Sequence, residues 1–207
     1  MVASIVRGGM VGGGVIVAIE GIDGAGKTTQ ARRLVRFLRS RGVESRYTAE
    51  PTGSWLGRSI RRFLRRKNVD PHLLALLFAA DRVDHVNRTV NPLLERGVVV
   101  VCDRYLYSSF AYQGVMTGRP LWVREINRMA PHPDVAVLLD ITVEEALARK
   151  RARIRFEDPA FLKDVRAEYL RLCDAGLMVR IDASRGVQEV FRELLSVVAP
   201  KLNIRAM

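Results

Sequence analysis

The sequence predicts an α/β protein built on an open, doubly wound sheet of five parallel strands with helices on both faces. Short runs rich in Val, Ile and Leu alternate with longer segments of helical periodicity. Runs such as VVVVC and VAVLL are apolar on both faces, as in parallel strands that helices cover from both sides. The 207 residues, of which 48% are hydrophobic and 27% charged, suit one globular domain.

Each expected element follows from its local pattern. The five strands are apolar, β-branched runs at residues 15–20, 43–48, 98–103, 135–140 and 178–182. Apolar residues at helical spacing predict helices at residues 27–41, 56–67, 73–95, 122–129, 144–151, 160–175 and 187–198. Because no repeat or change in composition interrupts this order, we expect one domain over residues 15–207. Residues 1–14 are expected to form a loose leader, within which Met10 is a second candidate start.

The charge balance of the chain favours anionic partners. Its 34 basic and 22 acidic side chains give a formal net charge of +12, which suits nucleic acid, an anionic membrane surface or phosphorylated metabolites. No uninterrupted apolar run reaches the roughly 18 residues of a membrane span, so we expect no membrane partner.

Cysteine usage and the N-terminal residues indicate a reducing compartment. Cys102 and Cys173 are the two cysteines, too few for a disulfide framework, and we expect both to be packed thiols. Residues 1–14 contain one Arg and a glycine cluster but no sustained apolar stretch, which makes a poor secretory signal. We therefore expect a cytoplasmic protein.

A glycine-rich loop follows the first expected strand. Residues 21–28 read GIDGAGKT and fit the pattern G-x-x-x-x-G-K-[ST] in the strand–loop–helix context that the pattern requires. Glycines let backbone N–H groups converge on an anion, and the helix that begins at Lys27 adds its positive end. Lys27 is expected on the β- and γ-phosphates of a nucleoside triphosphate, with the Thr28 hydroxyl on Mg²⁺.

The third expected strand ends with Asp103, and Arg104 follows it. An Asp that leaves an apolar strand beside a phosphate loop is placed to hold Mg²⁺, usually through water. Many motor ATPases have a Glu after that Asp to activate water, whereas this chain has a cation. Arg104 is better suited to binding a second phosphate group than to activating a nucleophilic water.

Phe78 and Arg82 form a candidate base-binding pair. They lie at positions i and i+4, on one face of an expected helix. An aromatic ring beside a guanidinium can stack on a base and bond its edge or its phosphate. A Phe among leucines at helical spacing is also typical of a packed core, so both interpretations stay open at this point.

Residues 149–155 read RKRARIR, with five cations in seven positions. Such a run is typical of a solvated helix face or a nucleic-acid patch. In a protein with a phosphate loop it can also be a mobile lid whose arginines neutralise charge during phosphoryl transfer.

Together these features resemble the thymidylate kinase family, P-loop nucleoside monophosphate kinases that phosphorylate dTMP. The stretch VVCDRYLYSSFAYQG (100–114) is the most specific part of the resemblance, which extends over nearly the whole chain from residue 15. The other matching stretches are IEGIDGAGKTTQ (19–30), EPTGSWLG (50–57), LLFAADR (76–82), the basic lid to RFE (149–157) and IDAS (181–184).

The resemblance implies ATP as phosphoryl donor and Mg²⁺ as cofactor. Thr28 and Asp103 would hold the metal, and Arg149 would lie along the adenine. The residues implied in ATP binding are Gly21, Gly24, Ala25, Gly26, Lys27, Thr28, Thr29, Arg149 and Ala183.

The resemblance also implies a dTMP site. Asp23 would meet the sugar 3′-hydroxyl, and Tyr112 would crowd the 2′ position and disfavour ribonucleotides. Phe78 would stack on thymine, Arg82 would bond the base edge, and Arg104 would hold the phosphate. The whole implied set is Asp23, Phe78, Arg82, Arg104, Ser109, Tyr112 and Gln113.

Two departures from the family pattern bear on catalysis. Some members place an Arg inside the phosphate loop, where this chain has Gly24, and members without it supply catalytic arginines from the lid. The resemblance then makes Arg153 the first choice and Arg151 the second, alongside Lys27, Arg104 and Asp23. Some members carry an Arg after the second strand; residues 51–54 read PTGS there, so either Arg58 or a nearby residue substitutes, or nothing does.

The expected activity is Mg²⁺-dependent phosphorylation of dTMP to dTDP by ATP, which feeds dTTP synthesis. One methyl group in a pocket discriminates by only ~1–3 kcal/mol, so some dUMP activity is expected. A kinase for dUMP or UMP on the same scaffold is one alternative. A P-loop regulator or nucleic-acid binder that uses the +12 charge is another, although we expect no nucleic-acid partner.

Family members form homodimers, and we expect one here by analogy. The apolar residues that would form the dimer face are Leu73, Leu74, Leu76, Leu77 and Val83. Burial within the monomer explains these residues equally well.

Overall fold

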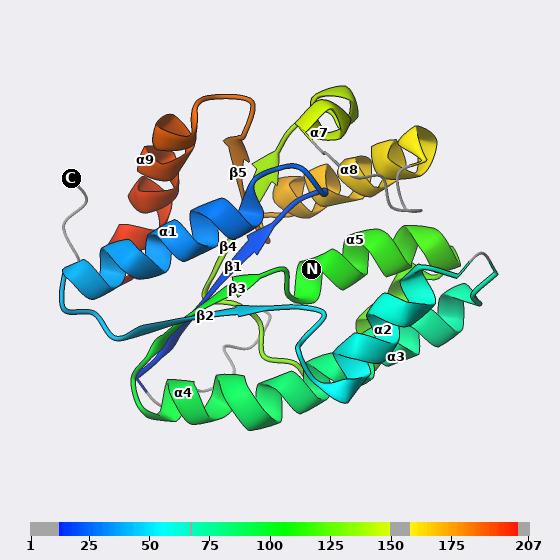
Figure 1. Cartoon of the computed structure of the whole chain (residues 1–207), viewed down its shortest axis with the longest axis horizontal. Coiled ribbons are helices and arrows are strands. Elements are labelled where there is room, and N and C mark those ends of the chain that lie inside the picture. The colour runs from blue at the N-terminus through cyan, green and yellow to red at the C-terminus, as the bar shows by residue number, and fades with distance from the viewer. Residues whose placement is uncertain (1–12, 67, 150–157, 203–207) are drawn as a thin grey trace, which may run out of the picture.

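The computed structural model describes residues 13–66, 68–149 and 158–202. Its sheet has five parallel strands in the order β2-β3-β1-β4-β5, with helices on both faces (Figure 1), and the predicted fold class is confirmed. The strands are β1 (Val15–Glu20), β2 (Ser45–Ala49), β3 (Val99–Asp103), β4 (Val135–Asp140) and β5 (Val179–Asp182).

The centre of the sheet explains why the apolar runs in the sequence are continuous. β3 and β4 are buried along their whole length, because helices cover both of their faces. β1 lies between β3 and β4 and pairs in parallel with both. The loops that follow β1 and β3 therefore open side by side at the carboxyl edge of the sheet, where parallel sheets bind ligands.

The helices lie in two layers. α1 and α9 lie on one side of the sheet, and α4, α5 and α8 on the other (Figure 1). The longer ones are α1 (Lys27–Ser40), α2 (Trp55–Leu64), α3 (Pro71–His85), α5 (Leu106–Thr117), α8 (Pro159–Asp174) and α9 (Val187–Val198). The shorter ones are α4 (Asn91–Glu95), α6 (Pro120–Ile126) and α7 (Val143–Arg149). A π-helical turn at Val86–Val90 joins α3 to α4, and a 3₁₀ turn at Ala199–Leu202 follows α9.

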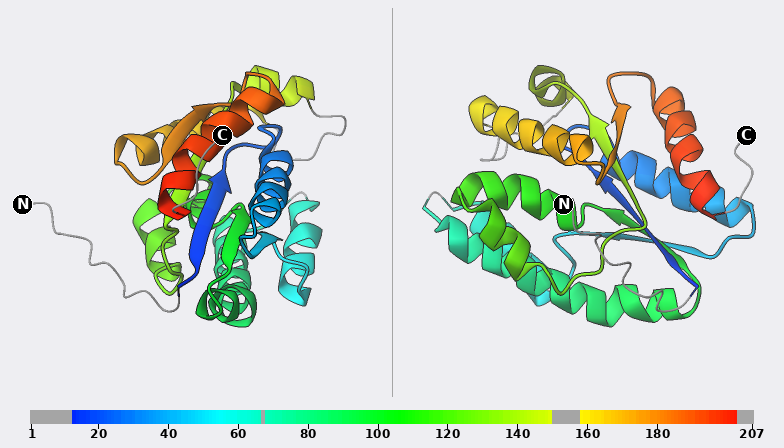
Figure 2. Two further views of the ribbon diagram at one scale, coloured as in Figure 1. Left: turned by 90° about the vertical axis from the view of Figure 1, so that its left-hand side faces the viewer. Right: turned by 180° about the vertical axis from the view of Figure 1, so that it is seen from behind.

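The main departure from the predicted elements is α5. Between the third and fourth strands the sequence predicted one helix, at residues 122–129, and α6 occupies that region. α5 was missed because it is buried on nearly every side, packed against α3, α6 and α8 (Figure 2). Its buried face includes Ser108, Ser109 and Gln113 as well as apolar residues, so the sequence shows no amphipathic stripe that periodicity can detect.

Both cysteines are free thiols, as expected. Cys102 is buried, and burial raises the pKa of its thiol; burial also raises the pKa of Cys173, to about 11. No helix in the described part of the chain is long and apolar enough to cross a membrane.

One close backbone contact fixes α2 to the loop that precedes it. Ser54 begins the helix, and its hydroxyl accepts a hydrogen bond from the Gly57 amide at 3.1 Å. A Cβ atom at Gly57 would lie 2.0 Å from the Thr52 carbonyl oxygen. Only glycine therefore lets the helix approach this loop.

Replacing Gly57 with Ala should lower the free energy of unfolding by about 1–3 kcal/mol, because backbone must shift to admit the methyl group. The matched control is Gly53→Ala, since a Cβ at Gly53 meets no atom within 4 Å; it should stay within about 0.5 kcal/mol of wild type. Urea unfolding followed by circular dichroism measures both variants. A Gly57→Ala protein as stable as Gly53→Ala would contradict the close contact.

Candidate active site

The phosphate loop connects β1 to α1. Gly21, Gly24 and Gly26 have φ angles of 138°, 92° and 90°, a region that favours glycine. A Cβ at Gly24 would lie 2.4 Å from the carbonyl oxygen of Ala146 in α7. An Arg at this position of the loop therefore does not fit the present packing.

Lys27 lies beneath the loop and is nearly inaccessible to solvent. Its ammonium donates to the Ile22 carbonyl at 2.8 Å and lies 3.8 Å from the Asp23 carboxylate. Burial, followed by the charge of Arg104, lowers the pKa of Lys27 to about 7. A bound polyphosphate would supply the negative charge that restores the protonated form.

Thr28 and Asp103, the two expected metal ligands, are brought together. The Thr28 hydroxyl donates to the Asp103 carboxylate at 2.5 Å, and the Tyr47 hydroxyl donates to the same oxygen at 3.1 Å. A hydroxyl and a carboxylate that meet beside a phosphate loop are the oxygen donors that Mg²⁺ prefers. The chemistry of this pair fits the expected ion.

Arg104 has a strained backbone and a constrained side chain. Its φ angle is 68°, the left-handed region that non-glycine residues seldom adopt. Its amide donates to the Ile19 carbonyl at 3.0 Å, and its guanidinium binds Asp23 and donates to Ser108 at 3.2 Å. The guanidinium also lies 4.9 Å from the centre of the Tyr112 ring. Strain of this kind persists only where several contacts enforce one conformation.

All seven residues that the resemblance implied for dTMP line one cavity of about 250 Å³. Its other lining residues are Glu50, Pro51, Arg61, Leu64, Ser108 and Met116. A second cavity, of about 370 Å³, contains the phosphate loop, Thr28 and Asp103. Asp23, Glu50 and Arg104 line both cavities, so the two adjoin at Arg104.

The implied adenine region lies on the other side of the phosphate loop. A cavity of about 470 Å³ there is lined by Gly24, Thr29, Arg149 and Ala183, among others. Arg149 donates to the carbonyl of Ala183 at 2.9 Å, which fixes its side chain along this wall. Gly21 lines none of the three cavities at this edge, since its Cα packs near the Leu139 carbonyl of β4.

Every N–H group of the Arg82 guanidinium has an acceptor within the protein. Glu50 accepts from Nε at 3.0 Å and from a terminal nitrogen at 2.6 Å. The Tyr105 carbonyl accepts at 3.0 Å, the Ser109 hydroxyl at 2.9 Å, and Asn127 Oδ1 accepts the remaining N–H. A base edge could therefore bond Arg82 only by replacing one of these acceptors. Of the side chains that accept from Arg82, Glu50 and Ser109 line the cavity.

Glu50 is the buried counter-charge of this cluster. His85 Nδ1 lies 2.9 Å from its carboxylate, and the Thr48 hydroxyl lies 2.7 Å from the other ring nitrogen of His85. Burial alone would raise the pKa of Glu50, but Arg82 and His85 outweigh it and lower the pKa below its ordinary value. The carboxylate thus stays charged and holds Arg82.

A second buried carboxylate supports the start of α5. Glu20 accepts from the Tyr105 amide at 3.0 Å and from the Ser108 hydroxyl at 2.5 Å. Burial raises the pKa of Glu20. These contacts tie the end of β1 to the segment that carries Arg104.

The loop after β2 is held by Asp81 of α3. The Asp81 carboxylate accepts from the Thr52 amide at 2.8 Å, from the Thr52 hydroxyl at 2.6 Å and from the Ser54 hydroxyl at 3.0 Å. The three bonds fix the loop that borders the 250 Å³ cavity through Pro51.

Arg61, and not Arg58, lines this cavity, whereas the sequence left open Arg58, a nearby residue or no substitute. Arg58 donates to the Gly53 carbonyl at 2.7 Å and does not line the cavity. Arg61, one helical turn further, donates to the carbonyls of Pro51 and Thr52 at 2.8 and 2.6 Å and does line it. Sequence reasoning named only "a nearby residue", because the helix face that meets the cavity was not readable.

The sequence did not single out Glu50, Arg61 or Asn127. Glu50 and Asn127 accept hydrogen bonds from Arg82, and Arg61 lines the cavity. Glu50 carried a usable signal, since it is an acidic residue at the carboxyl end of an expected strand. Asn127, 45 positions from Arg82, carried none. Arg151 and Arg153 lie outside the described residues, and their roles stay predictions.

Glu50→Ala should lower the free energy of unfolding by about 3–5 kcal/mol, because it leaves the buried Arg82 charge without a partner. The matched control is Glu125→Ala, since Glu125 pairs with Arg128 at the surface, where both side chains are largely exposed; it should change stability by less than about 1 kcal/mol. Urea unfolding at neutral pH measures both. Equal losses in the two variants would contradict the structural role of the buried pair.

Comparison with known proteins identifies the family. The family model described as thymidylate kinase matches residues 19–194. A probable thymidylate kinase of Pyrococcus abyssi is 41% identical over 200 residues, covering 91% of this chain and 98% of the relative. One of Methanothermobacter thermautotrophicus is 42% identical over 193 residues, covering 91% and 96%. The match of model, relatives and site geometry places this chain in the thymidylate kinase family.

Proposed function

We propose that this protein transfers the γ-phosphoryl group of ATP to dTMP and releases ADP and dTDP. The observation that carries the proposal is the pair of adjoining cavities that meet at Arg104. One is formed by a phosphate loop and the other by an aromatic ring, arginines and hydroxyls. The relatives described as probable thymidylate kinases support dTMP as the acceptor.

The protein's part in the reaction is alignment and charge stabilisation. Arg104 holds the acceptor phosphate, whose oxygen attacks the γ-phosphorus in line. The acceptor is already an anion near neutral pH and needs no strong general base. Lys27 neutralises charge on the donor phosphates. Burial and the Arg104 charge lower the pKa of Lys27 to about 7, and the phosphates would favour its protonated form.

Thr28 and Asp103 would hold Mg²⁺, since their oxygens meet beside the loop. The ion supplies neutralisation of the phosphate oxygens. Asp23, which binds Arg104 and lies near Lys27, would orient Arg104 and meet the sugar 3′-hydroxyl. Arg153, with Arg151 as second choice, would add positive charge from the lid.

The acceptor cavity favours a deoxy-pyrimidine nucleotide. Phe78 lines it and offers a ring for stacking, and Tyr112 lies against Arg104 where a 2′-hydroxyl would crowd it. A thymine methyl group changes kcat/KM by only about 10–200-fold. We therefore expect dUMP to be a poor but measurable substrate.

We propose a homodimer on the outer face of α3. Leu73, Leu76 and Val83 are 42%, 49% and 37% exposed, and with Ala80 they form one stripe at helical spacing. Leu74 is buried in the monomer and belongs to the core. The exposed apolar residues of α3 form a separate surface that suits a second copy.

The direct test of function measures ADP release with Mg·ATP and a panel of dTMP, dUMP, UMP, CMP and AMP. The rate should be highest with dTMP, lower with dUMP, and near background with the others. A rate independent of the acceptor would indicate an ATPase and contradict the proposal.

Arg61→Ala should raise KM for dTMP by about tenfold or more, because a charge-assisted contact to the phosphate contributes ~1.5–3 kcal/mol. Arg58→Ala, on the same helix but outside the cavity, is the control and should leave KM unchanged. Steady-state kinetics at saturating ATP distinguish the variants. Equal KM values in both would remove Arg61 from the acceptor site.

Leu76→Glu should convert a dimer to a monomer, because a charge in the stripe cannot be buried against a second copy. Val179→Glu, at a residue of similar exposure (47%) on β5, is the control and should leave the mass unchanged. Light scattering coupled to size exclusion reports the mass. A wild-type chain that elutes as a monomer would refute the dimer.

A further inference from the structure

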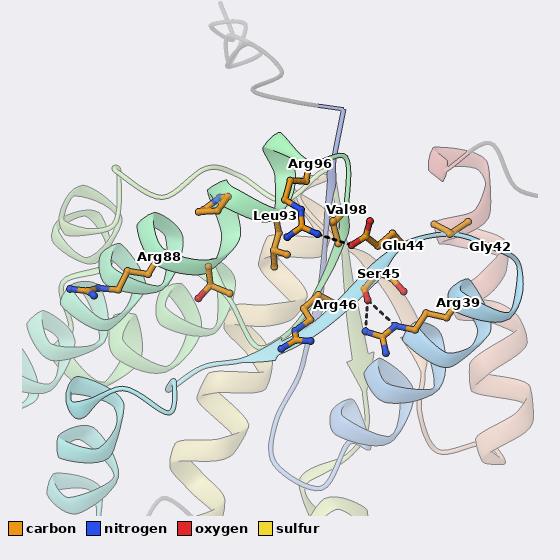
Figure 3. A pocket seen from close by; sticks show the side chains of 12 residues that line it. Arg39, Gly42, Glu44, Ser45, Arg46, Arg88, Leu93, Arg96 and Val98 are labelled. Carbon is orange, nitrogen blue, oxygen red and sulfur yellow. Dashed lines mark hydrogen bonds and ion pairs between the residues drawn. The ribbon is translucent and has the colours of Figure 1, made fainter.

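A cavity of about 780 Å³ lies at the opposite edge of the sheet from the candidate active site. The end of α1, the turn into β2, and the segment from the π-helical turn through α4 to Val98 surround it (Figure 3). It shares no lining residue with the three cavities at the carboxyl edge. Whatever binds here does so without contacting the reacting groups.

Positive charge dominates the walls of this cavity. Four arginines line it, against a single carboxylate, Glu44. The arginines come from four separate places in the fold, namely Arg39 from α1, Arg46 from β2, Arg88 from the π-helical turn and Arg96 from the end of α4. In Figure 3, Arg39, Arg46 and Arg96 lie around the first residues of β2.

The protein's own groups satisfy only part of this charge. Arg39 donates to the Ser45 carbonyl, and Arg96 makes a 3.2 Å ion pair with Glu44 in which both side chains are about two-thirds exposed. Arg88 pairs with Asp84 of α3 at 2.5 Å, and its own side chain is also largely exposed. Exposed pairs of this kind are weak. Arg46 has no hydrogen bond or ion pair to any residue that the structure describes.

Helix ends account for two of the arginines, and the ion pair with Asp84 accounts for Arg88. Arg39 lies in the last turn of α1 and Arg96 at the end of α4, where the negative end of a helix favours a cation. Arg46 lies on an edge strand and has no such reason to be there.

The lining also indicates the chemistry of the occupant. Arginine forks match phosphate oxygens, and a cavity of this size admits a ligand with several phosphates. No aromatic ring lines it to stack on a base. Recognition would therefore depend on the phosphates and not on a nucleobase.

We propose that this basic cavity is a second anion site that binds a ligand with several linked phosphates, either a free polyphosphate or the backbone of a nucleic acid. It is separate from the donor and acceptor sites and does not depend on the proposed activity.

The test uses the full chain, sodium tripolyphosphate as probe, and backbone amide signals in solution NMR. The signals of Gly42, Thr89 and Val98 report on this cavity, and those of the phosphate loop report separately. Titration should move both groups of signals, each with its own dissociation constant. If only the phosphate-loop signals move, the second site is refuted.

Arg46→Ala combined with Arg96→Ala should raise the dissociation constant at Gly42, Thr89 and Val98 at least about tenfold and leave the phosphate-loop constant unchanged. The matched control combines Arg128→Ala with Arg171→Ala, which removes the same charge from two exposed side chains, Arg128 in the turn after α6 and Arg171 in α8. The control should stay within about twofold of wild type, since distant surface charges are screened. Equal weakening in both double variants would show a general charge effect and overturn the proposal.

A second titration with short oligothymidylate distinguishes the two sources. If it moves the same cavity signals and competes with tripolyphosphate, the site binds a nucleic-acid backbone. If it leaves them in place while tripolyphosphate moves them, the site binds a free polyphosphate.

Discussion

The position of Arg104 is the constraint on which the candidate active site depends. The residue leaves β3 in a left-handed conformation, and its amide is held by β1 while its side chain is held by Asp23. This geometry turns the guanidinium to the boundary between the two cavities. A cation at that boundary can attract an acceptor phosphate toward a donor phosphate, although the two anions repel each other.

Buried charges around Arg104 make the site rigid before any ligand binds. Glu20 ties β1 to the start of α5, and Glu50 holds Arg82 with help from His85. Each of these carboxylates is buried, so each requires its partners to remain in place. These partners hold the groups that line the acceptor cavity in fixed positions. Fixed polar groups need little reorientation during phosphoryl transfer.

The sequence predicted the five strands, the phosphate loop and seven of the residues that line the cavity beside Arg104, because each leaves a local pattern or matches a family motif. It did not predict α5, since a helix that is buried on most sides and mixes apolar with polar residues there has no amphipathic stripe. It also did not reveal the role of Asn127 or choose Arg61 over Arg58. The choice between the two arginines depends on which face of α2 meets the cavity. The role of Asn127 depends on a contact with Arg82, 45 positions away, and local spacing reveals neither.

The central claim is that donor and acceptor nucleotides meet at Arg104, and a crystal structure with dTMP and a non-hydrolysable ATP analogue tests it most directly. The account predicts the triphosphate on the loop before Lys27, the dTMP phosphate on Arg104, and the thymine ring against Phe78. A pyrimidine nucleotide bound anywhere other than between Phe78 and Arg104 would contradict it.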